Sequence, residues 1–271
     1  MSYTVFQFSS KRFKLRFAVP EENVMESISV CMSIYGFSEF LPAQVESIIT
    51  QSTAIDEIIV VEDFSGLASP FDYLTEIFSA SQIKLVYFKL SKNVGPAEAF
   101  RLAISASSGD VIYLCDHDDI WESNRVENTI GYHAESLLVI VNGIVFNTEC
   151  TVEPSSIYFG LNMSFMRNLF KNEIVGATLS IDGKFARELS NCTSFYPMHD
   201  WVIASYSLLT HRRIAFVDEC LMHYRRHPGT FTGILDTSIY TKLKYRSGLL
   251  ISLLVACVKL SKKKIRQGGL N

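Results

Sequence analysis

The sequence predicts an α/β domain built on a mostly parallel, doubly wound sheet flanked by helices, followed by a C-terminal helical tail. Apolar strand-like runs alternate with helical segments from residue 28 to residue 116, and such alternation places parallel strands side by side through right-handed crossovers. The 271 residues are 48% hydrophobic and 20% charged, a globular composition that excludes a disordered, collagen-like or coiled-coil chain. No internal repeat or low-complexity linker divides the chain, so a single domain is expected.

Four strands and three helices account for the regular first half of the chain. The strands are apolar runs, as expected where both faces of a sheet are covered: Ile28–Ile34, Glu57–Asp63, Ile83–Leu90 and Asp110–Asp116. Ser38 is the expected N-cap of the first helix, whose apolar residues recur at helical spacing over residues 41–49. Pro70–Ala80 and Pro96–Ser107 are expected to form the other two helices.

The second half of the domain is less regular. We expect three further strands and one helix, in chain order Leu137–Phe146, Gly176–Ile181, Asp200–Leu209 (the helix) and Arg213–Val217. This pattern divides the chain into an N-terminal extension (residues 1–27), the α/β domain (28–236) and the tail (237–271).

The tail differs in charge from the rest of the chain. The whole protein carries a net charge of −3, yet no acidic residue follows Asp236 and eight basic ones do. Without those eight, 17 basic residues face 28 acidic ones, a net charge of −11. The apolar centre of the tail, Leu249–Val258, is about half the length needed to cross a bilayer. The tail is therefore either a helix packed on the domain with a solvated basic end or a peripheral attachment to an anionic membrane surface.

Other global features indicate the compartment and the class of partner. The first 26 residues lack the apolar core of a secretory signal, and six widely spaced cysteines form no Cys-x-x-Cys pair. We therefore expect a cytoplasmic protein with reduced thiols, bound at most to the inner face of the cytoplasmic membrane. The near-neutral charge balance argues against nucleic acid as a partner.

Polar residues follow each of the four regular strands. In chain order, these residues are Tyr35, Glu62 with Asp63, Asn93 with Gly95, and the run Asp116-His117-Asp118-Asp119. Ligands of open α/β sheets bind beyond the carboxyl ends of the strands, so these side chains are expected to meet at one edge.

The run Asp116–Asp119 places three carboxylates within four residues, and these repel one another unless a cation neutralises them. Mg²⁺ typically takes one or two protein carboxylates together with substrate phosphates. The alternative is that the acids cap a helix beginning near Trp121, where they would suit the helix dipole. The polar ends of the other strands favour a metal site.

Several segments together resemble the family 2 glycosyltransferases, which have the GT-A fold. The similar segments are Ile28–Gly36, Ile58–Ser65, Asn93–Ala103, Gly109–Trp121, His199–Trp201 and Tyr224–His227. The run Asp-His-Asp-Asp-Ile-Trp at 116–121 is similar to the Asp-Gln-Asp-Asp-Ile-Trp run of bacterial rhamnosyltransferase-like members. The resemblance implies a nucleotide-binding half over residues 28–121 and an acceptor half over 122–236.

The same resemblance implies roles for particular residues. Tyr35 would pack on the nucleotide base, Glu62 and Asp63 would meet the base or ribose, and Asn93 and Gly95 would also belong to the donor site. Asp116 would face the ribose and Asp118 would bind a divalent metal, Mg²⁺ or Mn²⁺, that bridges the donor diphosphate. Asp116 and His227 would be further contacts to this metal, and Asp200 would be the general base. We expect His199 to orient Asp200 or the backbone.

Departures from the family pattern leave open which nucleotide base the donor carries and which residues contact its diphosphate. Gly36 stands where an asparagine is frequent, Glu62 and Phe64 replace an aspartate and a small residue, and Glu98-Ala99 replaces an Arg-Asn pair.

The resemblance implies a metal-dependent, inverting glycosyltransferase that uses a nucleotide-diphosphate sugar. Its subgroup suggests dTDP-rhamnose as donor and a glycan or lipid-linked saccharide of bacterial surface polysaccharide synthesis as acceptor. Three alternatives stay open: a UDP-hexose or N-acetylhexosamine donor, a non-catalytic scaffold subunit, and a metal-dependent phosphohydrolase. Intact Asp118 and Asp200 argue against the scaffold, and Tyr35 with Glu62-Asp63 argues against the phosphohydrolase.

Overall fold

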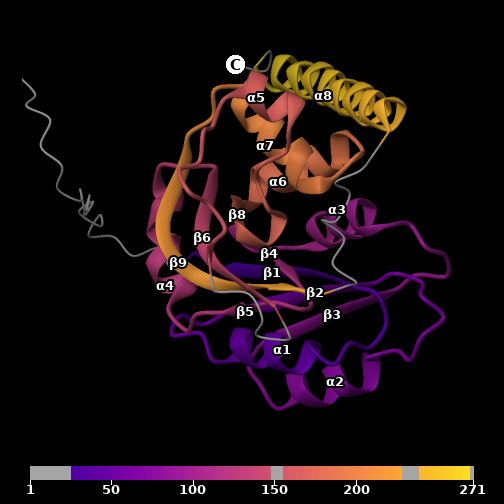
Figure 1. The fold of residues 1–271 in the computed structure, drawn as a ribbon, viewed down its shortest axis with the longest axis vertical. Coiled ribbons are helices and arrows are strands. Elements are labelled where there is room, and N and C mark those ends of the chain that lie inside the picture. Colours follow the sequence, from indigo (N-terminus) through magenta and orange to yellow (C-terminus); the bar gives the residue numbers. More distant parts are fainter. Residues whose placement is uncertain (1–25, 148–154, 228–237, 269–271) are drawn as a thin grey trace, which may run out of the picture.

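The computed structural model describes residues 26–147, 155–227 and 238–268, with the side chains of 264–268 excluded. Figure 1 shows a curved sheet with helices on both of its faces. The strand order is β3-β2-β1-β4-β8-β6-β9-β5, and β7 pairs with β6. The predicted α/β fold with a mostly parallel central sheet is confirmed.

The first half follows the predicted alternation closely. Its elements are β1 (Ile28–Ile34), α1 (Leu41–Ile49), β2 (Glu57–Glu62), α2 (Phe71–Ser79), β3 (Lys84–Lys89), α3 (Pro96–Ala106) and β4 (Val111–Asp116). The strands β3, β2, β1 and β4 are all parallel. The predicted cap of α1 was wrong, because Phe40 occupies the N-cap position and the Ser38 hydroxyl accepts a hydrogen bond from the Phe40 backbone N–H.

The second half contains both short and antiparallel elements. They are β5 (Ile120–Trp121), α4 (Arg125–Ile130), η1 (Gly131–Ala134), β6 (Leu138–Asn147), β7 (Ser155–Ser156), α5 (Phe165–Phe170), η2 (Gly176–Thr178), β8 (Leu179–Asp182), α6 (Gly183–Cys192), α7 (His199–Leu209) and β9 (Ile214–Arg226). The strand β8 lies antiparallel between β4 and β6. The expected strand at 176–181 is thus half 3₁₀ turn. The helix that was the alternative explanation for the acids at 116–119 begins only at Arg125, not near Trp121.

The strand β9 is much longer than the five residues expected from the sequence. It pairs in parallel with β6 along almost the whole length of that strand, with register shifts near Asn142. Gly143 permits this bend, because a Cβ there would lie 2.7 Å from the Met222 carbonyl oxygen. Figure 1 shows β9 curving around the molecule, so that its end returns to the carboxyl edge of the sheet.

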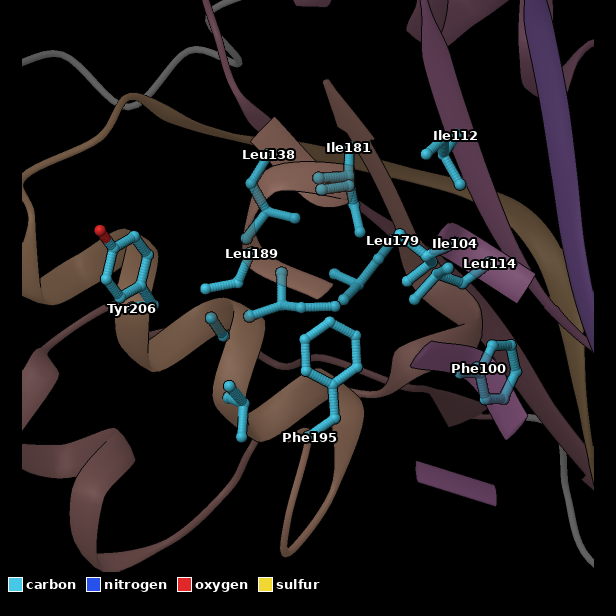
Figure 2. Close-up of a cluster of buried hydrophobic side chains, with 14 of the residues drawn as sticks. Phe100, Ile104, Ile112, Leu114, Leu138, Leu179, Ile181, Leu189, Phe195 and Tyr206 are labelled. Atoms are coloured by element: carbon cyan, nitrogen blue, oxygen red, sulfur yellow. The ribbon is translucent and has the colours of Figure 1, made fainter. Parts of the chain in front are cut away.

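Two apolar clusters lie on opposite faces of the sheet. One joins β1, β2 and β4 to α1, α2 and α4. The other joins the sheet to α3, α6, α7 and α8 (Ile239–Gly268), and Figure 2 shows its centre, where Phe195 and Leu189 contact residues of the strands. Both faces of β1 and β2 are therefore buried, which explains why most residues of these strands are apolar.

The tail forms the long helix α8, which packs on the domain. Leu249, Leu253, Ala256 and Leu260 are buried in the second cluster, on one face of the helix. This face of the tail is therefore packed on the domain, as the first of the two alternatives for the tail predicts. None of the helices in the described residues is long and apolar enough to span a membrane.

Candidate functional site

One cavity of about 1030 Å³ opens at the carboxyl edge of the parallel strands. Eight of the nine residues predicted for the site line it: Tyr35, Asp63, Asn93, Gly95, Asp116, Asp118, Asp200 and His227. They come from the carboxyl ends of β1, β2, β3, β4 and β9, the loops that follow them, and α7. The sheet register explains part of this convergence, because Ser33, just before the end of β1, lies opposite Asp116 on β4.

Glu62 is the residue that the structure does not bring to the cavity. Its Oε2 accepts hydrogen bonds from the Ser69 and Tyr87 hydroxyls at 2.6 and 2.7 Å and lies 3.8 Å from Lys89 Nζ. Side chains alternate between the two faces of a strand, so Glu62 and Asp63 cannot both point the same way. The structure therefore does not place Glu62 at the cavity, where the expected contact with a nucleotide would require it.

Asp63 shapes the wall of the cavity. Its carboxylate accepts hydrogen bonds from the backbone N–H groups of Val94 and Gly95, both at 2.8 Å. These bonds fix the loop that contains Asn93 and Gly95, where Gly95 has a φ of 80°. One carboxylate thus ties the ends of β2 and β3 together and holds the loop beside the cavity.

Asp116 and Asp118 give the cavity an acidic floor. Burial, together with the charges of Asp118 and Asp200, raises the pKa of Asp116 to about 8. The neighbouring Asp119 is fully buried, and its Oδ2 has no hydrogen-bond partner among the described residues. His227 Nε2 lies 2.8 Å from Asp118 Oδ2. A cation would relieve the repulsion within this cluster.

These side chains suit a divalent metal ion whose remaining ligands come from the substrate. Asp116 and Asp118 supply carboxylate oxygens and His227 an imidazole nitrogen, ligands that suit Mg²⁺ or Mn²⁺. No group of three or more His, Cys, Asp or Glu side chains within the described ranges forms a ready-made metal cage. Two or three protein ligands with phosphate oxygens are the arrangement that Mg²⁺ commonly uses.

Arg225, which belongs to the segment Tyr224–His227 that resembles a family motif, holds the loop that contains Asp118 and Asp119, a role that the motif did not specify. Its guanidinium lies between the rings of Phe40 and Phe146, 4.5 and 4.6 Å from their centroids. Its Nε donates to the Asp118 carbonyl at 2.7 Å and its backbone N–H to Asp119 Oδ1 at 2.9 Å. Both aspartates are therefore fixed to the end of β9.

Asp200 faces the acidic floor from the first turn of α7. It is 7% exposed, and burial raises its pKa to about 6, although the backbone N–H of Trp201 and the Asn172 side chain act in the opposite direction. Trp201 also lines the cavity, and its indole N–H donates to the Asn168 carbonyl. A carboxylate that is ionised at neutral pH yet more basic than usual suits a general base.

His199 does not orient Asp200 as expected. Its ring stacks on Phe100 with centroids 4.0 Å apart, and neither ring nitrogen has a hydrogen-bond partner among the described residues. Burial lowers its pKa to about 3, so the imidazole is neutral. Gly176 makes room for it, because a Cβ there would clash with the ring.

His223 and His227 pair with different acidic residues. His223 Nε2 pairs with Glu122 Oε1 at 2.6 Å, whereas His227 pairs with Asp118. Two acid–histidine pairs thus lie near the end of β9, and only the second lines the cavity.

The fold is similar to that of solved glycosyltransferase structures of the GT-A type. The structure of S. aureus TarS 1–349 in complex with UDP-GlcNAc superposes with a TM-score of 0.64 over 84% of this chain and 66% of that one, at 13% identity. The sequence profile of Glycosyl transferase family 2 matches residues 29–181, more than half of the chain. The chain therefore belongs to glycosyl transferase family 2, and it is a glycosyltransferase.

Curated relatives match over shorter segments. The chain is 34% identical over 103 residues to the Escherichia coli UDP-Glc:alpha-D-GlcNAc-diphosphoundecaprenol beta-1,3-glucosyltransferase WfgD, covering 38% of this chain and 39% of WfgD. It is 29% identical over 124 residues to the Streptococcus pneumoniae glycosyltransferase GlyG, covering 46% of this chain and 40% of GlyG. The matches thus span about two fifths of each relative.

Proposed function

We propose that this protein transfers a sugar, with inversion, from a nucleotide-diphosphate donor to a glycan or lipid-linked saccharide acceptor in bacterial surface polysaccharide synthesis. The observation that carries the proposal is the single cavity that joins the ends of β1, β2 and β4 to Asp200. Tyr35, Asp63, Asn93 and Gly95 would hold the nucleoside, consistent with a nucleotide-binding half over residues 28–121 and an acceptor half over 122–236.

Asp200 would act on the acceptor. Its carboxylate removes the proton of an acceptor hydroxyl as that oxygen attacks the anomeric carbon from the face opposite the leaving group. The bond between the anomeric carbon and the diphosphate oxygen breaks, and the nucleoside diphosphate leaves with the electron pair. The transition state resembles an oxocarbenium ion, as in glycoside hydrolysis. Burial around Asp200 raises the basicity of the carboxylate.

Asp116, Asp118 and His227 would hold a divalent metal on the donor side. When bound, Mg²⁺ or Mn²⁺ stabilises the charge that develops on the leaving diphosphate. Arg225 keeps Asp118 in position for this role, through the hydrogen bond to the Asp118 carbonyl.

Two donor classes compete. The run at residues 116–121 favours dTDP-rhamnose through its resemblance to rhamnosyltransferase-like members. The name of WfgD, which specifies UDP-Glc, favours a UDP-hexose.

A thermal-shift panel separates these readings. We expect one nucleotide sugar, at about 100 times its Kd and with Mg²⁺ or Mn²⁺ present, to stabilise the folded state by about 2.7 kcal/mol. For a domain of this size that corresponds to a rise of roughly 5 °C or more in Tm. The shift should shrink in EDTA. A flat response to dTDP-rhamnose, UDP-glucose and UDP-N-acetylglucosamine, with and without metal, would contradict both donor classes.

We also propose that α8 attaches the protein to the inner face of the cytoplasmic membrane. Opposite its buried face, α8 presents an apolar stripe of exposed residues: Tyr240, Leu243, Leu250, Ile251, Leu254 and Val258. Lys244, Lys259 and Lys262 flank this stripe, and no acidic residue occurs on the helix. An apolar stripe with lysines beside it suits an anionic lipid surface.

Ile251→Gln combined with Leu254→Gln should abolish binding to anionic vesicles without disturbing the buried face of α8. We expect wild type to sediment with phosphatidylglycerol vesicles at low salt and to be released at high salt. Leu67→Gln, which removes an exposed leucine from the other half of the molecule, should bind like wild type. Wild type that stays in the supernatant, or that forms a dimer through the stripe in sedimentation velocity, would contradict membrane attachment.

A further inference from the structure

The first turns of α8 line the same cavity as the proposed donor site. Lys242, Tyr245 and Arg246 all border it. They lie on the helix face that, further along, buries Leu249 and Leu253, since positions spaced by three, four and seven residues share one face of a helix. The packed face of α8 therefore extends past the core and overhangs the cavity with two basic side chains.

Arg246 is fixed in place with most of its donors unused. Its Nη2 donates to the Phe170 carbonyl at 2.9 Å, and its guanidinium lies 5.4 Å from the centroid of the Phe170 ring. No other hydrogen bond to this guanidinium is found within the described part of the chain. A planar guanidinium held in this way is suited to a bidentate contact with a phosphate.

The rim formed by α5, α8 and the loop after α5 carries a surplus of positive charge. Glu173 is the acid of this rim, and Arg167 binds it through two hydrogen bonds of 2.8 and 2.9 Å, with Lys171 Nζ at 3.4 Å. Lys242 is exposed, and its amino group has no acidic partner among the described residues. Lys242 and Arg246 thus face the cavity without compensation by a carboxylate.

This basic rim lies apart from the donor side. Figure 1 shows α8 and α5 at one end of the molecule and α1 and α2 at the other, with the carboxyl edge of the sheet between them. In the proposed function, the nucleoside lies against Tyr35 and Asp63, and the donor diphosphate lies at Asp118. In this arrangement the rim is left for a different anion.

We infer that Lys242 and Arg246 bind a phosphate or diphosphate carried by the acceptor, so that the substrate class is a saccharide linked through phosphate. This inference rests on the proposed function, because it takes the acidic side of the cavity as the donor site. Binding of the acceptor's phosphate at the rim would leave its saccharide between the rim and Asp200, with Trp201 lining the same space.

The test uses two probes that differ only in phosphate: the propyl diphosphate ester of N-acetylglucosamine and propyl N-acetylglucosaminide. Calorimetric binding is measured with the donor site filled by UDP and Mn²⁺, or by whichever nucleotide shifts the Tm of wild type. We expect wild type to prefer the diphosphate probe by about a hundredfold, and Lys242→Gln with Arg246→Gln to lose most of this preference. Affinity for the nucleotide should not change.

Lys259→Gln with Lys262→Gln is the matched control, because it removes the same charge from the same helix outside the cavity. This variant should keep the preference of wild type. The inference is overturned if wild type shows no preference, if the rim variant keeps it, or if the control loses it equally. Displacement of the probe by dihexanoyl phosphatidylglycerol at equal affinity would assign the rim to lipid headgroups instead. Failure of every nucleotide to bind would refute the proposed function, a result distinct from all of these.

Discussion

Asp118→Ala is expected to lower the rate of sugar transfer by roughly a thousandfold or more while leaving the fold intact. The substitution removes the carboxylate proposed to hold the metal and frees His227 from its 2.8 Å contact with Asp118. It also removes one of the charges that raise the pKa of Asp116, so the repulsion within the acidic floor becomes weaker. The Tm without ligand should therefore be unchanged or slightly higher, and excess EDTA should inactivate wild type to a similar extent.

Glu122→Ala is the control for this experiment. Glu122 and His223 form an acid–histidine pair four residues from Asp118 and His227 in each segment, but outside the cavity. The control should retain transfer with wild-type dependence on metal. Full turnover by Asp118→Ala, or equal loss in both variants, would remove Asp118 from the proposed metal site.

The sequence was sufficient to predict the first half of the fold because local pattern and tertiary structure agree there. Parallel strands covered on both faces are mostly apolar, and β1, β2 and β3 are each followed by a helix of clear periodicity. The second half depends on pairing between distant segments. The length of β9 comes from β6, some 75 residues earlier, and the sequence around Cys220 is too polar to suggest a strand. Nonlocal pairing of this kind leaves no local periodicity.

The residues of the candidate site that could be predicted are those at the carboxyl ends of the strands. Parallel strands bring their carboxyl ends to one edge, so Tyr35, Asp63 and Asp116 could be placed together from their positions in the sequence. The role of Arg225 in holding Asp118 and Asp119 could not be predicted, because the position of its guanidinium depends on Phe40 and Phe146, which lie far away in the chain. The contribution of α8 was missed for the same reason: only the packing of the tail on α6 and α7 brings Lys242 to the cavity.

Asp200→Asn is expected to lower kcat by about 10²–10⁴-fold and to leave binding of the nucleotide sugar unchanged. In wild type the rate should fall tenfold per pH unit below about pH 6, where the Asp200 carboxylate becomes protonated and can no longer accept a proton. The residual activity of the asparagine variant should lack this acidic limb. Asp72→Asn, an exposed position in the first turn of α2 outside the cavity, should keep both the rate and the pH profile of wild type.

The same substitution should stabilise the protein at alkaline pH. Burial raises the folded-state pKa of Asp200 to about 6, above its ordinary value of 3.8, so the ionised carboxylate opposes folding. Its contribution is most favourable below pH 4 and is lost as the pH rises through 6, a difference of up to about 3 kcal/mol. At pH 8 the asparagine variant should therefore melt at a higher temperature than wild type, and the two curves should converge near pH 4. An inactive variant that is also less stable at pH 8 would show that Asp200 supports the fold, whereas unchanged turnover would exclude it as the base.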